Sequence, residues 1–224
     1  MVLTIRVYSQ QFDTSLGTCT LIIYSGENLN NNEIKQLIIN EASNLVSDYG
    51  IVQKLPFQVL IPKTKKEFNS LVKTAPEWGI AVAIRGQNKI IIQAPSVSKI
   101  SYNRLKEVIV HEINHLYIHR IIKHSSIPSW FIEGMAMQAS GEFSLLHKIA
   151  ISQSLWKNNL IPLPGLYNFN TKPKAHIKLA YGQAAAAIQA LEYYYGKKIT
   201  NNLINLLRKE VDFWEGLTRL SGHD

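Results

Sequence analysis

The sequence predicts an α+β fold, in which a small mixed or antiparallel sheet is followed by a helical C-terminal half. Two observations predict this class. Short β-branched runs bounded by Gly, Asn and Pro recur between residues 2 and 93, which is the pattern of strands and turns. From residue 101 onward, apolar residues recur at spacings of three and four, which is the pattern of helices. We therefore expect a sheet-rich part over about residues 26–98 and a helical part over about 99–224.

The sheet-rich part begins with a predicted hairpin. Residues 2–8 and 18–24 gather apolar and β-branched residues around Gly17, and residues 1–25 form an extension of their own in this interpretation. A helix is expected over Glu33–Tyr49, because its apolar residues have helical spacing and Gly50 follows. The remaining elements are a strand, a short helix and a second hairpin, over Gln58–Ile61, Lys65–Val72, and Gly79–Arg85 with Lys89–Gln93.

The helical part begins with an apolar run from Ser101 to Lys123. A second helix is expected after Pro128, with Ser129 as its N-cap. Further helices are expected over Ser144–Trp156, Ile177–Tyr195, Asn201–Arg208 and Phe213–Leu220. Residues 157–176 contain three prolines and no periodicity. A loop of this length is usually functional, so we expect it to act as a lid at the mouth of a cleft.

Length and composition favour one domain over residues 1–224. No apolar run approaches the ~20 residues that span a bilayer. Residues 1–8 also lack the pattern of a signal peptide. The chain is therefore expected to be cytoplasmic as it stands, or extracytoplasmic if a leader is removed. Because Cys19 is the only cysteine, an intramolecular disulfide and a cysteine-rich metal site are both excluded, and we expect a small semi-buried side chain there.

The formal charge of +8 would suit nucleic acid, an anionic surface or an acidic substrate. The basic residues are nevertheless scattered, and their tightest group is Lys63, Lys65 and Lys66. No nucleic-acid motif accompanies them. We therefore expect an ordinary solvated surface and no nucleic-acid partner.

The strongest motif is His111-Glu112-Ile113-Asn114-His115, inside the apolar helical run. Positions i and i+4 lie one turn apart on the same helix face, so both imidazoles can reach one metal ion. This HExxH arrangement is that of zinc hydrolases, in which two His bind Zn²⁺ and the Glu is the general base. The sequence thus predicts an active-site helix with one catalytic zinc ion.

A catalytic zinc needs a third protein ligand. The metzincin pattern fails, because Ile118 and Ile121 stand where it requires Gly and His. His119 lies two turns from His111, so we expect it to be solvated or to support the site without binding the metal. Glu133 is the better candidate, since it falls in the first turns of the second predicted helix.

The segment Trp130-Phe131-Ile132-Glu133-Gly134-Met135-Ala136, following HExxH, resembles that of gluzincins. Among them, the compact peptidase MA-like proteins, including the minigluzincins, are the most similar. The likeness extends upstream through Trp78-Gly79-Ile80-Ala81 and downstream to Ala180-Tyr181-Gly182-Gln183-Ala184-Ala185. It implies a zincin-like fold with His111, His115 and Glu133 as metal ligands. It also implies that an edge strand, Lys89–Gln93, pairs with an extended peptide substrate.

The resemblance implies a zinc metallopeptidase in which Glu112 assists attack of a zinc-bound water on the peptide carbonyl. Tyr181 is the leading candidate for a donor to the oxyanion, and His176 is a weaker alternative. The absence of an acidic cluster that would bind an amino terminus favours an endopeptidase. The alternative hypothesis is a latent or catalytically weak zinc-binding scaffold of the same fold, its cleft covered by residues 157–176 or by a terminal segment.

Overall fold

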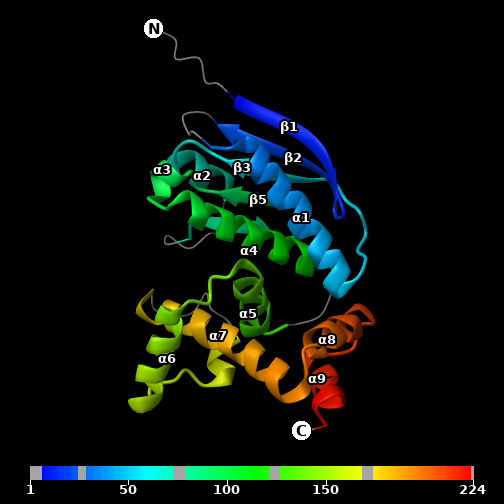
Figure 1. Cartoon of the computed structure of the whole chain (residues 1–224), viewed down its shortest axis with the longest axis vertical. Helices are drawn as coiled ribbons and strands as arrows, with labels where there is room; N and C mark the ends of the chain where they lie inside the picture. The colour runs from blue at the N-terminus through cyan, green and yellow to red at the C-terminus, as the bar shows by residue number, and fades with distance from the viewer. Residues whose placement is uncertain (1–6, 25–28, 73–78, 122–126, 168–173, 223–224) are drawn as a thin grey trace. The chain divides into compact units, whose positions relative to one another are not determined.

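The computed structural model describes residues 7–24, 29–72, 79–121, 127–167 and 174–222 (Figure 1). The chain divides into two compact units, residues 1–120 and 121–224, which are considered separately below. The α+β class is confirmed, with a small sheet in the first unit and helices throughout the second. The boundary differs from the prediction, because the long helix after residue 101 belongs with the sheet. Trp78, His124, Pro173 and His223 lie outside the described residues.

The first unit is built on a five-stranded mixed sheet with strand order β1-β2-β3-β5-β4. Strand β2 pairs in parallel with β3, and β3 pairs in parallel with β5. The two outer pairs, β1 with β2 and β4 with β5, are antiparallel. The strands span Val7–Thr14 (β1), Gly17–Tyr24 (β2), Phe57–Ile61 (β3), Ala81–Ile84 (β4) and Lys89–Ile92 (β5).

The N-terminal hairpin is an integral part of this sheet and not an appended extension. Its second strand, β2, pairs with β3 along five residues, and Cys19 and Leu21 are fully buried. The first strand spans Val7–Thr14 and so continues beyond the predicted span of 2–8, of which residues 2–6 lie outside the described part. Gly17 has a φ of +121°, and a Cβ there would lie 2.3 Å from the Leu55 carbonyl oxygen. The turn therefore requires glycine both for its backbone conformation and for space.

Strand β5, Lys89–Ile92, is not an edge strand. It pairs with β3 on one side and with β4 on the other. The expectation that this segment has an open edge was wrong, because the preceding strand of its hairpin, β4, pairs with the side that β3 leaves open. On this side of the sheet the last strand is β4, Ala81–Ile84.

Two long helices, α1 (Asn31–Tyr49) and α4 (Tyr102–Ile121), run side by side along the sheet (Figure 1). At their beginnings, Lys106 Nζ lies 3.0 Å from Glu33 Oε1. At their ends, the Tyr117 hydroxyl donates a 2.7 Å hydrogen bond to the Gly50 carbonyl. The short helix α2 (Lys65–Leu71) has a capping box at Thr64, and its Phe68 packs on Leu60 and Ile91 of the sheet. A four-residue helix, α3 (Pro95–Ser98), precedes α4.

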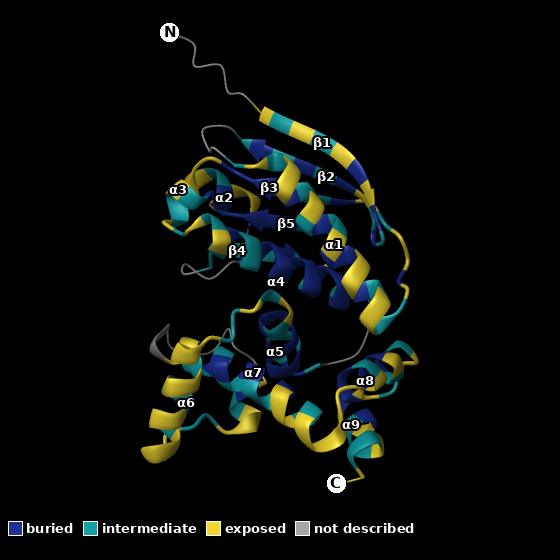
Figure 2. Cartoon of the chain, in the orientation of Figure 1, coloured by how far each residue is buried: buried dark blue, intermediate teal, exposed yellow. Residues whose placement is uncertain are grey.

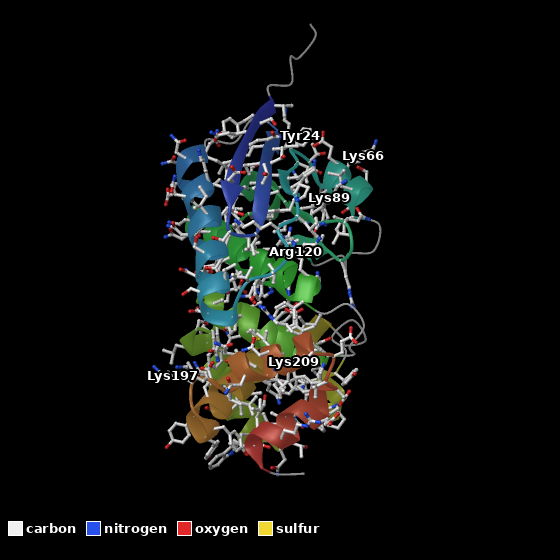
Figure 3. The ribbon with its side chains drawn as sticks, turned by 90° about the vertical axis from the view of Figure 1, so that its right-hand side faces the viewer. Tyr24, Lys66, Lys89, Arg120, Lys197 and Lys209 are labelled. Carbon is white, nitrogen blue, oxygen red and sulfur yellow. The ribbon has the colours of Figure 1, made fainter. Side chains whose placement is uncertain are left out.

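Arg120, near the C-terminal end of α4, fastens this helix to three loops (Figure 3). Its guanidinium donates to the carbonyls of Leu16 and Leu55 and to Asn88 Oδ1. It also lies over the Phe57 ring, with 5.4 Å from Cζ to the centroid. Burial lowers the pKa of Arg120 to about 10, so the group is charged at neutral pH. One side chain therefore fixes the hairpin turn, the segment before β3 and the β4–β5 turn.

The second unit consists of helices α5 to α9 with a short 3₁₀ helix, η1, among its described residues. They span Ser129–Ser140 (α5), Leu145–Trp156 (α6), Leu163–Leu166 (η1), Lys174–Tyr195 (α7), Ile199–Arg208 (α8) and Phe213–Ser221 (α9). Pro128, not Ser129, is the N-cap of α5, and it offers no side-chain cap bond. The ring of Trp130 packs edge-on against Phe131 and against Phe213 of α9. This aromatic cluster joins the first and last helices of the unit.

The described part of the predicted lid, residues 157–167, is anchored to its own unit. The Gln183 side chain of α7 bonds both to the Ile161 amide and to the Ile161 carbonyl, each at 3.0 Å. Ser129 N donates to the Tyr167 carbonyl, and Leu166 of η1 is buried. Residues 168–173 of this segment lie outside the described part. The loop is thus shorter than expected, because α7 begins at Lys174.

Replacing Arg120 with Met should destabilise the protein by about 2–4 kcal/mol, because carbonyl groups buried around the guanidinium lose a charged donor. Urea unfolding followed by circular dichroism measures the effect. Arg219→Met is the matched control, since Arg219 is exposed and pairs only with Glu215 one turn away within the described residues. We expect that change to cost less than about 0.5 kcal/mol. Equal losses in the two variants would contradict the anchoring role.

Stability should also depend on pH through Glu41 of α1. Burial raises the pKa of this carboxyl to about 7. A hydrogen bond with Asn44 lowers the pKa, and repulsion from Asp48 raises it further. The folded state keeps the proton where the unfolded chain has lost it, so stability falls between about pH 4.5 and pH 7. Glu41→Gln should therefore raise the unfolding free energy by about 1–3 kcal/mol at pH 8 and leave it unchanged below pH 4.5. A pH-independent difference in urea titrations would contradict this origin.

Candidate functional site

Helix α4 carries several buried residues, and some of them are polar. Residues 108–114 are all buried, and Ile109 and Ile113 are fully enclosed (Figure 2). A helix that is apolar nearly all round packs easily between a sheet and neighbouring helices. His111 and Glu112 interrupt this pattern, with only 8% and 7% of their surface exposed. Burying an imidazole and a carboxylate is costly unless each finds a partner, so their presence indicates a specific site.

The two histidines of the motif face each other. His111 Nε2 and His115 Nε2 lie 3.0 Å apart, and the ring centroids are separated by 4.6 Å at an interplanar angle of 78°. Two nitrogens that bind one tetrahedral zinc at about 2.0–2.1 Å lie roughly 3.3 Å from each other. The pair therefore already has nearly the spacing that a shared ion requires. The predicted i, i+4 arrangement is present, since α4 is continuous from Tyr102 to Ile121.

His119 does not join this pair. Its ring stacks on that of His115, with 6.1 Å between centroids and an interplanar angle of 14°. It is half-buried, so it is not freely solvated. It does not belong to the His111, His115 and Glu133 group that could hold a metal ion. The stacked ring restricts how His115 can turn.

Asn114 is a buried polar residue that the motif analysis did not single out. It is 1% exposed, and neither side-chain amide atom has a hydrogen-bond partner within the described residues. Such a group is uncommon in a protein interior. Nothing in the sequence distinguishes it, because the two variable positions inside HExxH tolerate many residue types.

The second unit supplies the other predicted residues. Glu133 is half-buried on α5, and Tyr181 is half-buried on α7. These helices pack closely at Gly134, where a Cβ would lie 2.4 Å from the Ala184 carbonyl oxygen. Only glycine permits this approach, which brings the helix of Glu133 against the helix of Tyr181. His176, the weaker alternative to Tyr181, is exposed near the start of α7.

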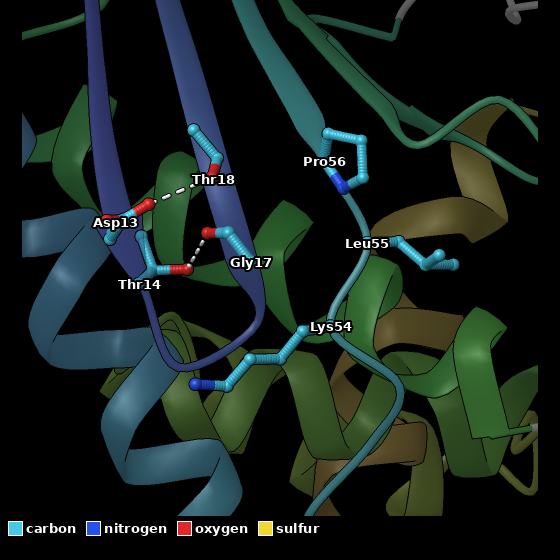
Figure 4. Close-up of a pocket in the computed structure, with 7 residues that line it drawn as sticks. All are labelled: Asp13, Thr14, Gly17, Thr18, Lys54, Leu55 and Pro56. Atoms are coloured by element: carbon cyan, nitrogen blue, oxygen red, sulfur yellow. Dashed lines mark hydrogen bonds between the residues drawn. The ribbon is translucent and has the colours of Figure 1, made fainter.

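A separate cavity of about 290 Å³ lies at the turn of the β1–β2 hairpin (Figure 4). It is lined by Asp13, Thr14, Gly17, Thr18, Lys54, Leu55 and Pro56. The Thr14 hydroxyl donates to the Gly17 carbonyl at 2.7 Å, and the Thr18 hydroxyl donates to Asp13 at 2.8 Å. None of the predicted site residues lines it. Its polar groups serve the turn, and we assign it no catalytic role.

Cys19 on β2 is fully buried, more deeply than expected, and burial raises the pKa of its thiol to about 12. It is therefore an inert part of the core. The lysines are spread over several elements, as Lys66, Lys89, Lys197 and Lys209 illustrate (Figure 3). Among the described residues, no helix is long and apolar enough to cross a membrane.

Comparison with known proteins places these features in a family. The model of the Peptidase MA superfamily matches residues 38–224, which include both HExxH and Glu133. No curated protein matches the chain. Among solved structures, an aminopeptidase N family protein from Idiomarina loihiensis is similar, with a TM-score of 0.63, 12% identity, and coverage of 91% of this chain and 41% of that one.

An M1 zinc metallopeptidase from Deinococcus radiodurans is also similar. A mutant form has a TM-score of 0.56 at 12% identity, covering 96% of this chain and 49% of that one. Another structure of this peptidase has a TM-score of 0.52 at 13% identity, covering 94% and 45%. At such identities the likeness concerns the fold, and the chain spans less than half the length of these proteins. The zincin-like fold is thereby confirmed.

The paired histidines give a direct prediction for metal binding. Protein prepared with zinc should contain about one ion per chain by elemental analysis, and His115→Ala should weaken zinc binding by more than about 100-fold. His119→Ala is the matched control, since its ring stacks on His115 without sharing the metal position. We expect that change to cost about tenfold, the low end of the effect of a residue that positions a ligand. A loss as large as that of His115→Ala would mean that His119 is itself a ligand.

Proposed function

Because the chain belongs to the Peptidase MA superfamily, we propose that it is a zinc-dependent metallopeptidase of gluzincin type that hydrolyses peptide bonds. The observation that carries the proposal is the 3.0 Å separation of His111 Nε2 and His115 Nε2 on the buried helix α4. A pair of imidazoles at this spacing suits one small divalent ion. The family assignment and the fold of the metallopeptidase neighbours support the same function.

We assign zinc to two imidazoles and one carboxylate, with Glu133 as the third ligand. Residue type supports this group, because His111, His115 and Glu133 each offer one ligand atom that can hold a metal ion. Two His and one Glu are a known donor set of catalytic zinc, and three protein ligands leave the fourth position open. The close packing at Gly134 supports the assignment further, since it holds the helix of Glu133 firmly within its unit.

When bound, zinc supplies a Lewis acid that polarises the scissile carbonyl and makes water acidic enough to be deprotonated near neutral pH. Glu112 takes the role of general base. It lies next to His111 in the same turn and is buried, so it can accept a proton from the attacking water and deliver it to the leaving amine. His119 stacks on His115 and keeps that ligand oriented.

Tyr181 is proposed as the donor to the oxyanion. Its phenol can provide one hydrogen bond to the negative charge that develops on the carbonyl oxygen. Its position on α7, packed against the α5 helix that carries Glu133, supports this role. His176 is set aside as a catalytic candidate because its side chain is exposed.

An extended peptide would add to the sheet at β4, Ala81–Ile84. Main-chain pairing with a sheet edge is a general way to bind peptides. The predicted segment at 89–93 has no open edge, whereas β4 is the last strand on that side of the sheet. We therefore assign the pairing with the peptide to β4.

We propose endopeptidase activity, and one observation favours aminopeptidase activity as a second candidate. A structural neighbour is described as an aminopeptidase N family protein. An endopeptidase accepts a peptide whose amino terminus is blocked, whereas an aminopeptidase needs a free amino group. Comparing the cleavage of a peptide with that of its N-acetylated form separates the two candidates.

The latent form is a further alternative, in which trimming by limited proteolysis should unmask activity.

The test of the mechanism separates metal binding from turnover. Glu112→Gln should retain about one zinc per chain and lose peptide hydrolysis by at least about 10³-fold, because the amide cannot accept the proton. Glu107→Gln is the matched control on the same helix. Glu107 forms an ion pair with Arg104 at 2.8 Å and is not among the proposed site residues, so this variant should retain activity.

The third ligand is tested alongside, because Glu133→Ala should lose both zinc and activity. Zinc retention by that variant would remove Glu133 from the donor set. Cleavage by a zinc-loaded Glu112→Gln protein at the parent rate would refute the mechanism.

A further inference from the structure

Helix α6 is largely exposed (Figure 2), and its exposed surface includes an apolar stripe. Leu145, Ile149 and Trp156 follow one another at spacings of four and seven, which places them on one side of the helix. Their exposed fractions are 70%, 43% and 91%. Leu146 and Leu155 flank the stripe and are exposed by 62% and 61%. Scattered exposed apolar residues need no explanation, but a contiguous group on one helix usually marks an interaction site.

The exposed stripe is not the side that attaches α6 to the protein. The opposite side carries His147, Ala150 and Ile151, which are half-buried. A Cβ at Gly182 of α7 would lie 3.3 Å from His147 Cβ and 3.5 Å from Ile151 Cδ1. Helix α6 thus packs on α7 through one face and presents a second apolar face outward. The outward face is therefore not needed to fold the helix against its unit.

Charge identifies the partner of this face. Residues 143–191 contain five lysines and neither Asp nor Glu. Two of the lysines, Lys148 and Lys157, lie on α6 or directly after it and are exposed. On the helical projection they fall on the two flanks of the stripe. An apolar face that includes Trp, bordered by Lys, is the pattern of helices that lie in the interface of a membrane.

We propose that α6 docks on the surface of an anionic phospholipid bilayer. Leu145, Ile149 and Trp156 would enter the boundary between headgroups and acyl chains, while Lys148 and Lys157 meet the phosphates. A second copy of the chain fits less well, since two segments with only positive charges repel one another. This binding is peripheral and stands independently of the proposed zinc site.

The test is sedimentation of the full chain with large unilamellar vesicles. We expect binding to vesicles of phosphatidylcholine with 30% phosphatidylglycerol, and at least tenfold weaker binding to pure phosphatidylcholine or in 0.5 M NaCl. Ile149→Ser with Trp156→Ser should lower the partition coefficient by about tenfold or more. Lys148→Gln with Lys157→Gln should lower it to a similar extent, at roughly fivefold for each lysine.

Ile51→Ser is the matched control, because Ile51 is 76% exposed in the other unit, and it should bind as the parent does. All these side chains are exposed, so circular dichroism and thermal unfolding should stay unchanged in every variant. Trp156→Leu should keep binding while removing the blue shift of tryptophan emission on vesicle addition. No binding to anionic vesicles, or binding that the α6 variants leave intact, would overturn the proposal. Concentration-dependent dimerisation lost in the same variants, without vesicle binding, would assign the face to a second copy.

Discussion

The structure around α4 depends on one constraint, which is that this helix carries two buried polar side chains, those of His111 and Glu112. The helix must be enclosed to exclude water from His111 and Glu112, yet these groups are costly to enclose. In the proposed metal site one shared cation would offset this cost, because His111 Nε2 and His115 Nε2 lie 3.0 Å apart. A rigid α4 would keep the two nitrogens at this spacing.

That rigidity comes from contacts along the whole length of α4. Lys106 and Tyr117 join it to the beginning and the end of α1, and Arg120 ties its last turn to three loops around the sheet. Arg suits this position because its planar group offers several donors in fixed directions. Lysine, with one rotating ammonium group, would not reach all three acceptors in the same way.

The second unit uses close helix packing for the same purpose. Gly134 allows a close backbone approach between α5 and α7. The Gln183 side chain of α7 is hydrogen-bonded to the backbone of Ile161. Helix α6 differs, since it packs on α7 through one face and leaves a second apolar face outward. Within one unit, therefore, some helices position catalytic candidates and another presents a surface for interaction.

The sequence by itself determined the local features of this protein. The i, i+4 spacing of His111 and His115 follows from helix geometry alone, and the end of α1 follows from Gly50. Tertiary structure alone decided which strand ends the sheet, that the N-terminal hairpin is part of it, and which groups Arg120 binds. Its acceptors Leu16 and Leu55 lie 104 and 65 positions away. Local periodicity carries no information on such pairings, because they depend on strand order and on which apolar faces meet.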